Sequence, residues 1–197
     1  MILYIHGFAS CGSGSKVQVL QTHFGQDRVI SPDLPVDPQQ AINCLQQIID
    51  TKQISLLVGS SLGGYYSEYL NARFNIPSVL INPSTCPFDT LRQYVGMNTN
   101  WCSEEKFEWK LEYCDFLKSV YREAPSSSEA YLVLLQSADE VLDYRLAEER
   151  YRQHRVIVEQ GGNHRFENLA DYLPNIDEFI ASRSLLGLGD RSEGEPF

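Results

Sequence analysis

The fold is decided by the stretch Ile54-Ser55-Leu56-Leu57-Val58-Gly59-Ser60-Ser61-Leu62-Gly63-Gly64. Its first five residues form an apolar run with the length of a buried strand, and helical apolar spacing follows from residue 62 to residue 74. The join reads G-x-S-x-G with Ser61 at its centre, in the strand–turn–helix context in which this pattern is meaningful. The stretch therefore predicts a tight turn that presents Ser61 at the start of a helix. The alternative is a glycine-rich turn in which Ser61 only caps that helix.

Strands and helices alternate along the rest of the chain. Apolar runs that fit buried strands lie at residues 2–5, 29–31, 54–58, 78–81, 131–135 and 156–158. Helical apolar spacing is found at residues 16–24, 38–51, 62–74, 144–154 and 167–182. We therefore expect a three-layer α/β fold, in which a mostly parallel sheet of about six strands has helices on both faces. Ligands of such sheets bind beyond the carboxyl ends of the strands, so the residues after each strand are the candidates for a site.

The alternation is interrupted once, between Pro83 and Tyr131, by a segment too long for a simple crossover. We expect residues 85–124 to form a helical insertion that covers the carboxyl edge of the sheet as a lid. Aromatic residues are frequent in it, namely Trp101, Phe107, Trp109, Tyr113, Phe116 and Tyr121. These side chains either line the lid or only pack the insertion onto the body of the protein, and the sequence leaves both interpretations open.

One globular domain fits the length and the composition. The chain has 197 residues, of which 43% are hydrophobic and 21% are charged. We assign residues 1–184 to a single domain. Residues 185–197 are rich in glycine and charge, so we expect them to form a disordered tail.

The charge balance argues against a nucleic-acid partner. The formal net charge is -10 and no cluster of Lys and Arg opposes it, so a phosphate backbone would be repelled. Small anionic substrates are not excluded, because a pocket can have a local field of its own. No apolar stretch reaches the roughly 18 residues that span a bilayer, so we expect no membrane partner.

The first residues and the cysteines indicate a reducing compartment. Residues 1–7 form a short apolar run without a preceding basic region, which is typical of a strand and not of a signal peptide. The cysteines are odd in number and form no C-x-x-C pair: Cys11, Cys44, Cys86, Cys102 and Cys114. We therefore expect a cytoplasmic protein without a disulfide framework.

The hydroxyl of Ser61 is a weak nucleophile at neutral pH and needs a base within hydrogen-bond reach. Of the four histidines, His23 and His154 lie late in predicted helices among polar neighbours. His6 follows the first strand. His164 stands in the loop after the last strand, from which an imidazole can reach over Ser61. We predict His164 as the general base.

Three acidic residues follow the strand at residues 131–135 and could orient the imidazole of His164. Asp139 is first in the turn and nearest to the strand, so we predict that it is the partner. Glu140 and Asp143 remain alternatives, although Asp143 also fits as the cap of the next helix. The resulting chain order of serine, aspartate and histidine is that of α/β-hydrolases.

A tetrahedral intermediate needs hydrogen-bond donors for its oxyanion. We predict as donors the backbone N–H groups of Leu62, which follows the serine, and of Phe8, which follows the first strand. Four residues that flank these donors are predicted to contact the substrate: His6, Gly7, Ser60 and Tyr65.

Neither a cofactor nor a metal is expected. The run Gly12-Ser13-Gly14-Ser15-Lys16 lacks the spacing of a phosphate-binding P-loop, and the dinucleotide pattern fails at Val17. The histidines are isolated, and the carboxylates lack a paired histidine at metal-ligand spacing.

Five short motifs follow one another along the chain. They are YIHGF at 4–8, GSSLGGY at 59–65, INP at 81–83, DEVLDY at 139–144 and GGNHRF at 161–166. In this order they resemble the YqiA-like small bacterial esterases within the α/β-hydrolase superfamily, from residue 1 to about residue 183. The resemblance implies a carboxylesterase that acts on short acyl esters, with Ser61, Asp139 and His164 as its triad. One departure is Ser137-Ala138, where that family commonly has a glycine.

The residues and the resemblance together predict a serine hydrolase with a small-molecule ester as substrate. A thioester hydrolase would use the same residues with a different leaving group. An acyltransferase would need a site that favours another alcohol over water. The alternative of another class is a binding protein that has kept this fold without catalysis.

Overall fold

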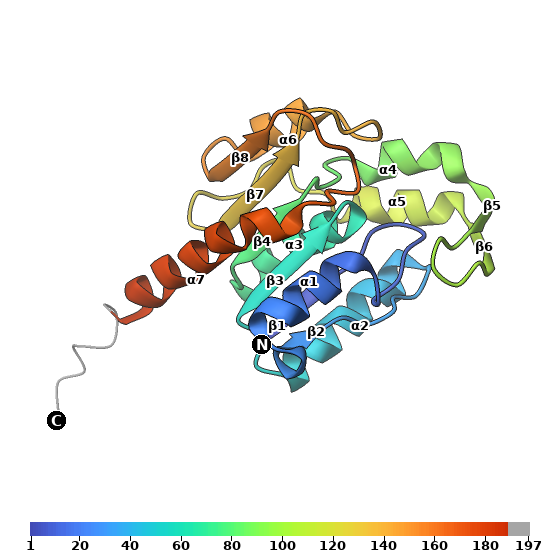
Figure 1. Ribbon diagram of the computed structural model, residues 1–197. Coiled ribbons are helices and arrows are strands. Elements are labelled where there is room, and N and C mark those ends of the chain that lie inside the picture. The colour runs from blue at the N-terminus through green and yellow to red at the C-terminus, as the bar shows by residue number, and fades with distance from the viewer. Residues whose placement is uncertain (189–197) are drawn as a thin grey trace, which may run out of the picture.

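Six parallel strands form the central sheet. The computed structural model describes residues 1–188, and the side chains of residues 1–183. The strands are β1 (Ile2–Ile5), β2 (Val29–Ile30), β3 (Leu56–Ser60), β4 (Ser78–Ile81), β7 (Tyr131–Gln136) and β8 (Arg155–Glu159). Their order in the sheet is β2-β1-β3-β4-β7-β8, and each neighbouring pair is parallel. The strand that leads to Ser61, β3, therefore lies in the interior of the sheet (Figure 1).

Helices cover both faces of this sheet (Figure 1). They are α1 (Ser15–Phe24), α2 (Pro38–Thr51), α3 (Leu62–Phe74), α6 (Tyr144–Arg150) and α7 (Leu173–Leu188). Side chains alternate along a strand, so Ile2 and Tyr4 of β1 share a core with α1 and α7, whereas Leu3 and Ile5 share one with α2 and α3. The predicted three-layer α/β fold is confirmed. None of the helices within residues 1–188 combines the length and the apolar character needed to cross a bilayer.

The end of the domain differs from the prediction. The last helix, α7, starts at Leu173, directly after the 3-10 helix η3 (Leu169–Tyr172). Another 3-10 helix, η1 (Gln26–Arg28), lies between α1 and β2. Residues 185–188, which the sequence assigns to a disordered tail, continue α7. Three of these four residues are leucine, which is a strong helix former. The rest of the predicted tail, 189–197, lies outside the described residues.

The insertion is a mixed segment and not the helical one that the sequence predicts. It contains α4 (Pro87–Thr90), η2 (Leu91–Tyr94), β5 (Gly96–Thr99), β6 (Lys106–Trp109) and α5 (Leu111–Ser119). The strands β5 and β6 form an antiparallel hairpin. They escaped prediction because each has only four residues, too few to distinguish a strand pattern from a helical one. In Figure 1 these elements lie together beyond one end of the sheet.

The aromatic residues of the insertion mostly serve its packing. Trp109 is 1% exposed and belongs to the same core as α2 and α3, where Phe107, Tyr113 and Phe116 pack against it. Trp101, in contrast, is 84% exposed at the tip of the hairpin. The buried aromatic side chains of the insertion therefore pack it onto the body of the protein.

A disulfide connects the insertion to the loop after β1. Cys11 and Cys102 are bonded, with a distance of 6.0 Å between their Cα atoms, although 91 positions separate them in the sequence. The expectation that the cysteines form no disulfide is wrong for this pair. The error arose because only the fold of the insertion, which the sequence pattern does not reveal, brings the two residues together. Cys44, Cys86 and Cys114 are free thiols.

Candidate active site

The turn between β3 and α3 holds Ser61 in a strained backbone conformation. Its φ of 54° and ψ of -120° lie in a region that residues with a side chain rarely adopt. A Cβ atom on Gly59 would lie 2.3 Å from the carbonyl oxygen of Gly63, and one on Gly63 would lie 2.0 Å from the carbonyl oxygen of Ile5. The two glycines are therefore needed for strand and helix to approach this closely. Ser61 makes no side-chain capping bond to α3, so the alternative of a simple helix cap does not describe it.

The side chains of Ser61, His164 and Asp139 form one hydrogen-bonded chain. The Oγ of Ser61 lies 3.1 Å from the Nε2 of His164. The Nδ1 of His164 lies 2.8 Å from the Oδ2 of Asp139. An ionised carboxylate can only accept, so Nδ1 carries the proton and donates it to Asp139. This tautomer leaves Nε2 as the acceptor for the hydroxyl of Ser61.

The environment of Asp139 fixes its carboxylate. The side chain is 2% exposed, and its Oδ1 accepts hydrogen bonds from the backbone N–H groups of Val141 and Leu142, at 2.9 and 2.8 Å. The two alternative acids have other contacts. Glu140 accepts a bond from the backbone N–H of His164, which lowers the pKa of its carboxyl group. Asp143 caps α6 and pairs with Arg145, which lowers its pKa.

A buried amide connects the loop of His164 to the sheet. Asn82, directly after β4, is 2% exposed and has a φ of 39°, which asparagine tolerates better than most residues. Its Nδ2 donates to the carbonyl oxygens of Asn163 and His164, at 3.1 and 3.3 Å. Its Oδ1 accepts from the backbone N–H of Gln136, at 2.9 Å. One side chain thus links the end of β7, which leads to Asp139, with the backbone that carries His164.

Asn82 was not predicted as a site residue from the sequence, where it stands within the INP motif. Its place after a buried strand, at the edge where ligands of parallel sheets bind, was the signal that could have identified it.

Two backbone N–H groups lie in segments next to Ser61. Leu62 is the first residue of α3, and Phe8 follows Gly7 in the loop after β1. Within the described chain neither N–H has an internal hydrogen-bond acceptor. A Cβ atom on Gly7 would lie 3.1 Å from the Cβ of Ser61, so the loop passes directly over the serine. Within the described chain, both N–H groups therefore lie near Ser61 without an internal acceptor.

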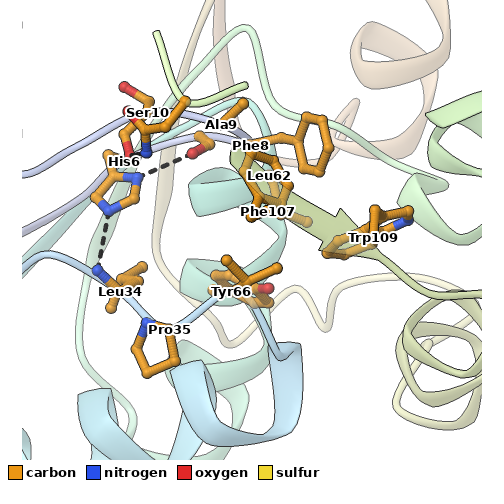
Figure 2. Close-up of a pocket in the computed structure, with 13 residues that line it drawn as sticks. His6, Phe8, Ala9, Ser10, Leu34, Pro35, Leu62, Tyr66, Phe107 and Trp109 are labelled. Carbon is orange, nitrogen blue, oxygen red and sulfur yellow. Dashed lines mark hydrogen bonds between the residues drawn. The ribbon is translucent and has the colours of Figure 1, made fainter. Parts of the chain in front are cut away.

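His6 holds this loop in place through two hydrogen bonds. Its Nε2 accepts from the backbone N–H of Leu34 at 3.1 Å, so its Nδ1 is the donor to the carbonyl oxygen of Gly7 at 2.9 Å (Figure 2). Burial lowers the pKa of His6, which favours this neutral form. Both ring nitrogens are occupied, so His6 contributes structure to the loop.

The other two predicted substrate contacts lie in the core. Ser60 is 7% exposed beside Tyr4. Tyr65 is 3% exposed, and its hydroxyl donates to the carbonyl oxygen of Leu117 in α5 at 2.7 Å. Tyr65 therefore anchors the insertion, and we do not assign either residue to substrate binding.

A cavity of about 50 Å³ borders the two backbone donors. Gly7, Phe8 and Leu62 line it together with mostly apolar side chains, several of which are labelled in Figure 2. The ring of Phe8 packs against the rings of Tyr94, Phe107 and Trp109, with centroids 5.0 to 5.6 Å apart. The insertion thus supplies part of the cavity wall and holds the loop that carries Phe8.

The site is defined by these side chains and not by cavity size. A larger hollow of about 490 Å³ lies near the opposite ends of β1 and β3, beside Ile2 and Leu56, and none of the candidate residues borders it. Within the described residues, no three His, Cys, Asp or Glu side chains are placed to hold a metal ion.

Comparison with known proteins identifies relatives along nearly the whole chain. The model of the uncharacterised protein family UPF0227 matches residues 1–181. A UPF0227 protein from Citrobacter koseri is 28% identical over 188 residues, which cover 91% of this chain and 98% of that protein.

Solved structures share the fold at low identity. A putative hydrolase from Agrobacterium vitis superposes with a TM-score of 0.73 at 15% identity, covering 91% of this chain and 87% of that one. Est1E from Butyrivibrio proteoclasticus, with ferulic acid bound, superposes with a TM-score of 0.68 at 13% identity, covering 96% and 89%. At such identities the likeness concerns the fold.

Proposed function

This chain belongs to the uncharacterised protein family UPF0227, and we propose that it is a serine hydrolase that cleaves carboxylic esters of short acyl groups. The observation that carries the proposal is the chain of contacts from Ser61 Oγ to His164 Nε2 at 3.1 Å and from His164 Nδ1 to Asp139 Oδ2 at 2.8 Å. The names of the proteins that share the fold, a putative hydrolase and Est1E, agree with it.

The proposed reaction is acyl transfer in two steps. Ser61 Oγ attacks the ester carbonyl while His164 Nε2 takes its proton, and the imidazolium then returns the proton to the leaving alcohol. Water, deprotonated by the same Nε2, releases the acid from the acyl-enzyme. The buried carboxylate of Asp139 stabilises the imidazolium. The N–H groups of Phe8 and Leu62 donate to the oxyanion of each tetrahedral intermediate.

The test is turnover of a series of p-nitrophenyl esters beside the corresponding acyl-CoA thioesters. We expect hydrolysis of esters with two to about six acyl carbons, because a cavity of about 50 Å³ admits only a few groups of water size. Faster cleavage of the thioesters would assign the same residues to a thioester hydrolase. A folded protein that turns over neither series and forms no adduct with a fluorophosphonate would be a binding protein instead.

Asn82→Asp is expected to lower kcat on the order of a hundredfold with little change in KM. The carboxylate would face the carbonyl oxygens of Asn163 and His164 that the amide now binds, so the imidazole would move away from Ser61. Steady-state kinetics on p-nitrophenyl butyrate measure the split between kcat and KM.

The matched control is Asn71→Asp. Asn71 is an equally buried amide that donates to the Oγ of Ser78 and the carbonyl oxygen of Ala130. Ser78 is the first residue of β4, whereas Asn82 follows the last one. This variant should lose thermal stability but retain kcat. Equal loss of kcat in both variants would reduce the role of Asn82 to general stability.

A further inference from the structure

The hydroxyl of Tyr66 has no hydrogen-bond partner within the described chain, although the side chain is 3% exposed. A buried tyrosine hydroxyl usually finds a partner. The other deeply buried tyrosines of this protein follow that rule. Tyr4 has a side-chain hydrogen bond with Ser60, and the hydroxyls of Tyr65, Tyr131 and Tyr151 donate to Leu117, Glu129 and Glu68, respectively. Tyr66 is the exception that needs an explanation.

Tyr66 lines the cavity that the two proposed oxyanion donors border. Tyr66 lies one turn beyond Leu62 on α3, and both residues line the cavity. Among the described residues, the fully buried side-chain N and O atoms without a hydrogen-bond partner belong to Ser31, Asn71, Ser84 and His154. The unpaired oxygen of Tyr66 is not one of them, so it is not completely enclosed by protein atoms. Figure 2 shows Tyr66 between Leu34 and Pro35 on one side and Phe107 and Trp109 on the other. The other polar side chains of the cavity lining are those of His6, Ser10 and Asn100, and the side chains of His6 and Asn100 bind backbone groups.

This hydroxyl is a donor at neutral pH. Burial raises the pKa of Tyr66 well above its ordinary value, and the negative charge of Asp37 raises it further. A protonated phenol in a mostly apolar cavity is best matched by an oxygen that accepts a hydrogen bond. A substrate that supplies only methylene groups would leave the donor unpaired.

We propose that the cavity is the acyl pocket and that Tyr66 selects short acyl groups carrying an ether, hydroxyl or keto oxygen in the chain. The proposal rests on the proposed function, since the acyl group must be bound at Ser61 to extend past Phe8 and Leu62. The substrate class is therefore esters of short oxygen-substituted carboxylic acids. Tyr66 is a specificity-determining residue in this assignment and takes no part in bond cleavage.

The test compares esters that differ by one exchange of CH₂ for oxygen. The first pair is p-nitrophenyl methoxyacetate and p-nitrophenyl butyrate, and the second is p-nitrophenyl 3-methoxypropionate and p-nitrophenyl pentanoate. For each pair the measured quantity is the ratio of kcat/KM for the ether ester to kcat/KM for the alkyl ester. In at least one pair we expect Tyr66→Phe to lower this ratio about tenfold. The intrinsic reactivity of the esters cancels in the comparison of the two proteins.

Tyr65→Phe is the matched control, because its hydroxyl is adjacent in sequence but is bound to Leu117 outside the cavity. Its ratio should equal that of the unmodified protein. A second measurement needs no variant: the ratio in the unmodified protein should exceed, by about tenfold, the ratio of the rates at which hydroxide hydrolyses the same two esters.

The outcomes separate this inference from the proposed function. Turnover of all four esters with ratios that Tyr66→Phe leaves unchanged would mean that a water serves the hydroxyl, and the assignment of Tyr66 would fall while the hydrolase proposal stands. Ratios equal to those of hydroxide hydrolysis would overturn it in the same way. Absence of turnover for every ester would overturn both.

Discussion

Ser61→Ala is expected to lower ester turnover on the order of a millionfold, to the level left by the remaining site. The hydroxyl is the group that would form the acyl-enzyme, and its Oγ is the atom in contact with His164 Nε2. Alanine suffers the same backbone strain at φ 54° as serine, so the fold should be retained. Mass spectrometry after incubation with a fluorophosphonate should show one adduct on the unmodified protein and none on the variant.

Ser67→Ala serves as the control for this experiment. Ser67 is fully buried on the same helix, and its hydroxyl donates to the carbonyl oxygen of Gly63. The Ser67→Ala variant should still form the fluorophosphonate adduct at Ser61 and turn over the ester at the rate of the unmodified protein. An adduct on Ser61→Ala at another residue, with turnover retained, would refute the assignment of the nucleophile.

Asp139→Asn is expected to lower kcat on the order of ten-thousandfold. The asparagine oxygen can still accept from the N–H groups of Val141 and Leu142, so the loop keeps its shape. Its amide group, however, places a donor against His164 Nδ1, where a carboxylate now accepts. The imidazole must then carry its proton on Nε2, which can no longer take the proton of Ser61. Thermal unfolding and kcat, measured together, distinguish this loss from unfolding.

Asp143→Asn is the paired variant. Asparagine is as good a helix cap as aspartate, and Asp143 caps α6 away from the imidazole. We expect kcat within about twofold of the unmodified protein, as for most surface substitutions. If Asp143→Asn were as damaging as Asp139→Asn, the choice of acid would be wrong.

The sequence predicted those parts of the molecule that depend on local pattern. The apolar run before Gly59 and the helical spacing after Ser61 determine where β3 ends and α3 begins, and both lie within two residues of the prediction. The loops of Asp139 and His164 were found because parallel strands bring their carboxyl ends to one edge. Each of these inferences uses neighbours in the sequence or one general rule of topology.

The features that were missed depend on contacts between distant segments. The hairpin of β5 and β6 is stabilised by packing around Trp109, and no pattern within four residues announces it. The disulfide joins Cys11 with a residue of that hairpin. The hydroxyl of Tyr66 has no hydrogen-bond acceptor in the described chain and its side chain lines the cavity, whereas the hydroxyl of the adjacent Tyr65 donates to Leu117. Such distinctions arise only in three dimensions.

The disulfide between Cys11 and Cys102 restricts how the insertion could move if it acts as a lid. Two hydrogen bonds reinforce it, from the backbone N–H of Trp101 to the carbonyl oxygen of Ala9 and from the Nδ2 of Asn100 to that of Ser10. Cys11 is three residues from Phe8. While the bond is intact, a displacement of the hairpin tip therefore pulls on the segment that carries Phe8, one of the two proposed oxyanion donors. Movement of the hairpin tip and the position of the Phe8 N–H are then coupled. A thiol reductant, by breaking the disulfide, would allow the hairpin to move without the Phe8 loop.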